Sequence, residues 1–184
     1  MNQEFGVTAW GADWRRLAEP TTVDRPNPAL PQARSLTRHD HVHDLHIATG
    51  TITATVDDRE PRHVSIALPT WTDAQHRQAT AHLAEQGAAD DLPDIAHNTL
   101  RDAGLEPAPD PATTTAECDC TNRTRPCAHI LAVYYETARR LDERPRLALT
   151  LRHADTTRAD ESTSRIPLTR IDPASFYSSH RTSR

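Results

Sequence analysis

Alternating apolar and polar residues dominate the chain between residues 42 and 68. Successive side chains of a strand point to opposite faces, so strict alternation indicates a strand with one buried face. Turn-forming residues, Gly50 and the cluster Asp57–Pro61, divide the segment into three runs. The pattern predicts three strands of an antiparallel meander. Their apolar positions are Leu45 and Ile47, then Ile52, Ala54 and Val56, then Val64, Ile66 and Leu68.

Two helices are predicted directly after these strands. Thr72 and Gln75 have the spacing of a capping box, and the helix that they open is expected to end near Gly87. A second, shorter helix is predicted around residues 93–103, with Gly104 as its C-cap. The chain therefore changes from strand patterns to helix patterns near residue 70.

All three cysteines fall within ten residues, as Cys118-x-Cys120 and then, after six further residues, Cys127-x-His129. Three thiolates and one imidazole are the ligand set that tetrahedral Zn²⁺ prefers. Residues i and i+2 of an extended segment face the same side, so the first two cysteines can share one ion. The spacing predicts a structural zinc site, and a shell closed by four protein ligands leaves no metal-bound water for catalysis.

Two other interpretations of the cysteines stay open at this point. A disulfide across Cys118 and Cys120 would be strained and would leave one thiol over. A redox or catalytic thiol would need one cysteine beside a base, not three. Met1–Thr8 has neither the basic start nor the apolar core of a signal peptide, so a reducing cytoplasm is expected, where disulfides rarely persist.

An amphipathic helix is predicted after the zinc motif, because apolar residues recur there at steps of three and four. These positions are Ile130, Val133, Tyr134, Ala138 and Leu141.

The predicted elements indicate an α+β fold class: an N-terminal three-stranded antiparallel meander with two helices, followed by a zinc knuckle leading into an amphipathic helix. The 184 residues are enough for one ordinary domain with a small appended module. We predict an N-terminal α+β domain over residues 1–105, a proline-rich linker over 106–117, a zinc-binding module over 118–152 and a flexible tail over 153–184.

Charge is spread unevenly along the chain. The formal net charge is -5, which argues against a globally basic nucleic-acid binder, and all 21 cationic residues other than histidine are arginine. The segment Cys118–Arg152 holds seven of these arginines and four acids, so the predicted zinc module is basic within an acidic protein. No stretch approaches the roughly 18 apolar residues of a membrane-spanning helix.

The zinc motif and its flanks resemble the SWIM zinc finger, a C-x-C…C-x-H module. The stretches 127–135, 141–145 and 147–152 are similar to bacterial SWIM proteins that are often encoded beside a Swi/Snf-type helicase. The opening of the chain, with Phe5-Gly6 and Trp10-Gly11, also resembles that subfamily. The likeness covers about residues 5–152.

This resemblance implies a non-enzymatic accessory factor. It implies zinc ligation by Cys118, Cys120, Cys127 and His129. Its expected partners are DNA or RNA, or a protein that works on nucleic acid, such as a Swi/Snf-type helicase. The alternative is a purely protein–protein adaptor in which zinc only folds the docking surface.

Four arginines are the candidate contact residues for nucleic acid or a partner. Arg123 and Arg125 lie on the loop beside the predicted zinc site, and Arg139 and Arg140 lie on the helix that follows. A guanidinium fork can grip a phosphate with two hydrogen bonds. The histidines of the tract His39–His46 suggest a second metal site, although a solvent-exposed strand face is the simpler interpretation.

Overall fold

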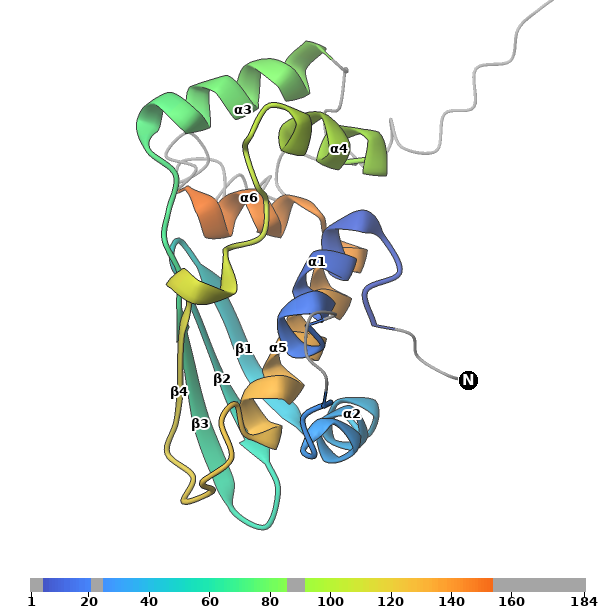
Figure 1. The fold of residues 1–184 in the computed structure, drawn as a ribbon, viewed down its shortest axis with the longest axis vertical. Coiled ribbons are helices and arrows are strands. Elements are labelled where there is room, and N and C mark those ends of the chain that lie inside the picture. The colour runs from blue at the N-terminus through green and yellow to red at the C-terminus, as the bar shows by residue number, and fades with distance from the viewer. Residues whose placement is uncertain (1–4, 21–24, 86–91, 154–184) are drawn as a thin grey trace, which may run out of the picture. The chain divides into compact units, whose positions relative to one another are not determined.

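A four-stranded antiparallel sheet and six α-helices form the part of the chain that the computed structural model describes, residues 5–20, 25–85 and 92–153 (Figure 1). All of these residues belong to one compact unit, Met1–Ala154. The strands lie in chain order across the sheet: β1 (Val42–Ala48), β2 (Thr51–Asp57), β3 (Pro61–Ala67) and β4 (Thr115–Cys118). The helices are α1 (Ala9–Ala18), α2 (Leu30–Arg38), α3 (Asp73–Glu85), α4 (Asp94–Asp102), α5 (Ala128–Glu143) and α6 (Arg146–Arg152), and a short 3₁₀ turn, η1, covers Pro111–Thr113.

The α+β fold class is confirmed, and the sheet is larger than the sequence predicted. Strands β1, β2 and β3 correspond to the three predicted runs, with Ile52 paired to Ile66 and Ala54 paired to Val64. These four side chains point into the core, and Gly50 turns the chain between β1 and β2 with a φ of +70°. The fourth strand, β4, was not predicted, and neither were α1, α2 and α6 as helices.

Strand β4 joins the C-terminal part of the chain to the sheet. It pairs antiparallel with β3, with Ala116 opposite Ile66 and Cys118 opposite Val64. Asp119 extends the pairing, because its N–H donates to the His63 carbonyl at 3.3 Å and its carboxylate accepts from the His63 N–H at 3.1 Å. Three residues of the predicted linker and Cys118, the first residue of the predicted zinc-binding module, therefore belong to the same sheet as β1, β2 and β3.

Helix α5 lies at the centre of the helical layer. The sequence predicted an amphipathic helix, yet buried residues occur all round α5, from Ala128 to Ala138 without a break. Helices α1 and α2 pack on one side of it and the sheet lies on the other (Figure 1). Trp14 of α1 approaches Tyr134 with ring centroids 6.2 Å apart, and Phe5 approaches Tyr135 at 5.2 Å.

The glycines near the N-terminus allow the close approach of α1 to α5. Gly6 has a φ of +69°, and the backbone N–H groups of Gly6, Val7 and Thr8 all donate to the Asp142 carboxylate at 2.8–3.0 Å. The Thr8 hydroxyl adds a fourth hydrogen bond at 2.7 Å. A side chain on Gly11 would collide with the Asp142 carboxylate and would lie 2.7 Å from the backbone oxygen of Ala138.

Helix α3 begins as predicted, and helix α4 begins and ends close to its predicted bounds. Thr72 and Gln75 form the reciprocal capping box, with N···O distances of 2.9 and 3.3 Å. Helix α4 is followed by Gly104 at a φ of +73°. The predicted end of α3 near Gly87, and the tail from residue 154 onwards, lie outside the described residues.

Candidate metal centre

Four side chains from the predicted motif converge at one end of the sheet. One ligand atom from each of Cys118, Cys120, Cys127 and His129 lies within 4.8 Å of every other. Cys127 is fully buried, and Cys120 and His129 are only 9% and 7% exposed. The Cys3His cluster is therefore geometrically suited to hold a metal ion.

Two structural elements position these ligands. Cys118 is the last residue of β4, and Cys120 follows after the turn that Asp119 ties to β3. Cys127 is the N-cap residue of α5, and His129 lies in its first turn. The loop between Cys120 and Cys127 is held by the segment just before α2. The side-chain amide of Asn27 in that segment donates to the Pro126 carbonyl at 2.9 Å. The sheet and the central helix thus meet at the cluster.

Two of the distances within the cluster are close to those expected for a tetrahedral metal site. With Zn–S bonds of about 2.3 Å and Zn–N bonds of about 2.0 Å, the ligand atoms of a tetrahedron lie roughly 3.5–3.8 Å apart. The Nδ1 atom of His129 lies 3.6 Å from the Cys118 sulfur and 3.9 Å from the Cys127 sulfur. The ring nitrogen that faces the sulfurs is therefore Nδ1.

The other ring nitrogen of His129 faces a carboxylate. Its Nε2 atom lies 3.4 Å from Oδ2 of Asp58, in the turn between β2 and β3. Metal-bound histidines usually donate their second ring N–H to a carboxylate or carbonyl, which fixes the tautomer and orients the ring. Asp58 completes this arrangement, and sequence reasoning missed it because the two residues are 71 positions apart and share no local pattern.

Arg125 folds back over the cluster. Its Nη1 atom lies 3.9 Å from the Cys120 sulfur, and its Nη2 atom lies 3.4 Å from the Cys120 carbonyl oxygen. The same guanidinium donates to the backbone carbonyls of Asn122 and Thr124. A cation at this position stabilises thiolate charge on the cluster.

Without metal, the cluster holds protons unevenly. Burial raises the pKa of the Cys118 thiol to about 12. Burial also acts to raise the pKa of Cys127, but hydrogen bonds from the His129 ring and from backbone N–H groups outweigh it and lower that pKa to about 6. The hydrogen bond with Cys127 in turn raises the pKa of His129 to about 9, against the opposing effect of burial.

The four candidate contact arginines have different surroundings. Arg123 is exposed on the loop beside the cluster, whereas Arg125 is engaged with Cys120. Arg139 and Arg140 both bind the carboxylate of Glu136, which is 1% exposed, with N···O distances of 2.8 and 2.9 Å. Arg139 also lies 3.3 Å from Asp40. These two helix arginines thus neutralise a buried acid.

The histidine tract is not assembled as one face of a strand. His39 caps the end of α2 and binds the carbonyl of Ser35 at 2.8 Å, while β1 begins only at Val42. A bulge follows between His43 and His46. Across residues 5–20, 25–85 and 92–153, the Cys3His cluster is the one group of three or more such side chains close enough to share a metal ion.

Comparison with known proteins gives one distant similarity. The chain is 26% identical over 125 residues to the uncharacterized protein Rv2102 of Mycobacterium tuberculosis, a match that takes in 63% of this chain. The chain spans 45% of the length of that relative. No protein-family model matches the chain, and no solved structure matches it.

Proposed function

We propose that this protein is a non-enzymatic interaction module of the SWIM type, folded around a structural zinc ion. Cys118, Cys120, Cys127 and His129 would be its four ligands. The protein would act as an accessory factor for a partner that works on nucleic acid, such as a Swi/Snf-type helicase.

The proposal rests chiefly on the completeness of the ligand shell. Three buried or half-buried sulfurs and one imidazole lie within 4.8 Å of one another, and Asp58 holds the imidazole with Nδ1 toward the sulfurs. Four protein ligands saturate tetrahedral Zn²⁺, so the ion would fold and orient the chain and would not activate water. This is the physical reason for a structural role instead of a hydrolytic one.

Metal analysis tests the centre directly. We expect one zinc per chain after purification, and we expect Co²⁺ substitution to give the intense visible bands of tetrahedral cobalt with thiolate ligands. Cys120→Ser should lose the metal and part of the α5 helical signal, because metal binding and folding are coupled in such sites. A stoichiometry near zero, or a helical signal that a strong chelator leaves unchanged, would contradict the proposal.

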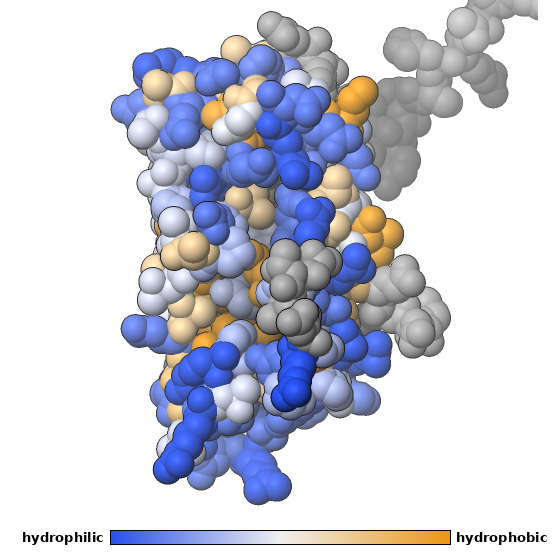
Figure 2. All heavy atoms as spheres, in the orientation of Figure 1, coloured by the Kyte–Doolittle hydropathy of each residue, from blue (hydrophilic) through white to orange (hydrophobic). Residues whose placement is uncertain are grey.

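The surface around the centre favours a protein partner. The β2–β3 turn (residues 57–62) and the loop between the candidate metal ligands (residues 119–126, the zinc loop) form a strongly hydrophilic end of the described unit (Figure 2). Its four arginines, in residues 57–62 and 119–126, are balanced by four acids within the same two segments. A charge-balanced surface with little excess of cations suits a polar protein interface better than a phosphate backbone.

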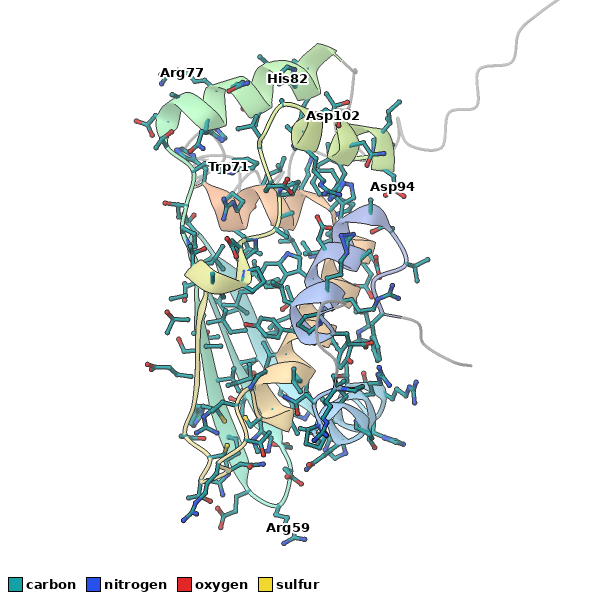
Figure 3. All side chains as sticks on the ribbon, in the orientation of Figure 1. Arg59, Trp71, Arg77, His82, Asp94 and Asp102 are labelled. Atoms are coloured by element: carbon teal, nitrogen blue, oxygen red, sulfur yellow. The ribbon has the colours of Figure 1, made fainter. Side chains whose placement is uncertain are left out.

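Direct contact with DNA or RNA is the second candidate function, and exposed arginines support it. Arg123 projects from the zinc loop, and Arg59 lies at the tip of the β2–β3 hairpin (Figure 3). Two phosphate contacts would give a shallow salt dependence, with a log–log slope of about -2 for duplex DNA.

The two functions are separated by a binding assay with the double variant R59Q/R123Q. Duplex DNA, single-stranded DNA and RNA are titrated by fluorescence anisotropy at low salt. Arg77→Gln serves as control, because Arg77 is exposed on α3 at the other end of the unit (Figure 3). Binding that R59Q/R123Q abolishes and Arg77→Gln leaves intact supports nucleic-acid contact, whereas absence of binding to all three probes leaves the protein-partner role.

A further inference from the structure

One face of the sheet is left open by the helical layer. In β2 and β3 the side chains of Ile52, Ala54, Val64 and Ile66 are buried on the face that packs against α5, and the alternate residues, most of them polar, lie on the other face. Thr53, His63 and Ser65 on this open face are exposed. Within the described residues, no helix packs against this side of the central strands (Figure 1).

The open face is hollowed and acidic. A depression of about 590 Å³ crosses the sheet from Asp44 on β1 to Glu117 and Asp119 at β4. Hydroxyl groups of Thr53, Thr55 and Ser65 lie between these acids. No arginine is among the described residues that line the depression, and the chain contains no lysine. The described lining thus holds three acids and, as its one basic side chain, His63, so acidic side chains are in excess at the two edges of the face.

The acidic edges are fixed by backbone features. Asp44 lies in the β1 bulge with a φ of +50°, which sets its side chain at the rim of the depression. Glu117 is exposed in the middle of β4. These acids do not form a metal site, because they are not within shared ligand distance in the described structure. Their separation suits a longer cationic molecule.

We propose that the open face of the sheet binds an extended segment of a protein partner that carries two cationic side chains four residues apart. Charge complementarity argues for this occupant, since the face would repel a nucleic-acid phosphate backbone and attract arginine or lysine. This proposal rests on the proposed function, because it names the chemistry of the protein partner that the proposed function calls for. Binding at the open face itself requires only that the sheet is folded.

The spacing follows from the geometry of the sheet. Neighbouring strands lie about 4.8 Å apart, so β1 and β4 are separated by roughly 14 Å across three intervals. An extended chain rises about 3.3 Å per residue, so four residues span roughly 13 Å. An offset of four is even, which places both cationic side chains on the same side of the extended segment. The threonine and serine hydroxyls of the face can then accept hydrogen bonds from the segment between them.

Two isomeric peptides test the proposal on the full-length, metal-loaded chain. The first is acetyl-Gly-Arg-Thr-Ser-Thr-Arg-Gly-amide, and the second has the same composition with adjacent arginines. Each is titrated into ¹⁵N-labelled protein at low salt while amide shifts are followed. We expect the spaced peptide to shift amides of β2, β3 and β4, including Thr53, Ser65 and Glu117, and to bind at least threefold more tightly than its isomer. Shifts confined to other elements, no shifts, or equal binding of the isomers would overturn the proposal.

Charge variants provide a matched control. D44N/E117Q removes one acid from each edge, and asparagine tolerates the positive φ at residue 44. It should weaken binding of the spaced peptide roughly threefold to tenfold, from two exposed charge pairs. D102N/E143Q removes the same charge from exposed positions on α4 and α5 and should change binding less than twofold. Equal weakening by both variants would show nonspecific attraction and overturn the proposal.

The spectra of each variant also report whether the metal-bound fold is intact, so failure of the zinc centre is distinguished from failure of this binding face.

Discussion

Asp58→Asn is predicted to weaken zinc binding without removing a ligand. The Asp58 carboxylate lies 3.4 Å from Nε2 of His129, and its side chain is 36% exposed. Loss of such an outer-shell partner typically lowers metal affinity tenfold to a hundredfold. The Asp58–His129 contact is long and Asp58 is partly exposed, so we expect a loss of zinc affinity at the lower limit of this range. That loss is about tenfold, or about 1.4 kcal/mol of binding free energy.

Competition with a chromophoric chelator measures this loss. The matched control is Asp57→Asn, because the Asp57 carboxylate lies 3.3 Å from Nε2 of His43 and belongs to the same hairpin. The control should keep zinc affinity within about twofold, since it changes only an exposed charge pair. Unchanged affinity in Asp58→Asn, or an equal loss in both variants, would refute the assigned role of Asp58.

Three further outcomes follow from the structure. Gly11→Ala should destabilise the fold by about 2 kcal/mol in urea unfolding, because its new methyl group would press on the Ala138 carbonyl and the Asp142 carboxylate; an unchanged midpoint would contradict the close α1–α5 packing. Asp142→Ala removes the acceptor of four hydrogen bonds of 2.7–3.0 Å and should lower the free energy of unfolding by about 3 kcal/mol. As a control, Glu143→Gln at the exposed neighbouring position should lower it by less than about 0.5 kcal/mol. Apparent zinc affinity should rise with pH by at least about a hundredfold per unit near pH 7, because the metal displaces at least two protons there, from His129 with its pKa near 9 and from Cys118 with its pKa near 12. Chelator competition between pH 6.5 and 7.5 measures the slope, and a flat profile would contradict this assignment.

Strong periodic patterns account for the parts of the fold that the sequence predicted. The alternation in residues 42–68 specified β2 and β3, because each of them buries one face against the helices. Strand β1 follows the alternation less closely, because a bulge between His43 and His46 interrupts it. The capping box and Gly104 marked helix ends through local hydrogen bonds and backbone conformation. These signals are local, so they can be recognised in the sequence without knowledge of the tertiary structure.

The missed elements depend on distant partners or carry misleading local signals. Strand β4 has four residues, and its pairing is supplied by the edge of β3 about 50 residues earlier. Helix α2 begins at the end of a proline-rich stretch, and such a stretch favours a loop, yet Pro31 is tolerated because it occupies the first turn of the helix. Helix α6 shows leucines at 147, 149 and 151, an alternation that does not resemble a helix.

The candidate site divides in the same way. The spacing of Cys118, Cys120, Cys127 and His129 was enough to predict that these side chains would lie close together. Their proximity depends only on one short loop and on the start of one helix. The pairing of Arg139 and Arg140 with Glu136 was not predicted, because burial of the acid depends on the packing of α5. Asp58 required the complete sheet to bring it to the cluster.

The position of α5 has a consequence for synthesis on the ribosome. The segment that occupies the middle of the described unit, residues 128–143, is translated after nearly all the segments that surround it. A nascent chain that ends before residue 128 lacks the helix against which α1, α2 and the first three strands bury much of their apolar surface. Release of one helical segment from the exit tunnel then supplies both the missing centre and the last two candidate metal ligands, so cotranslational folding and metal capture should coincide.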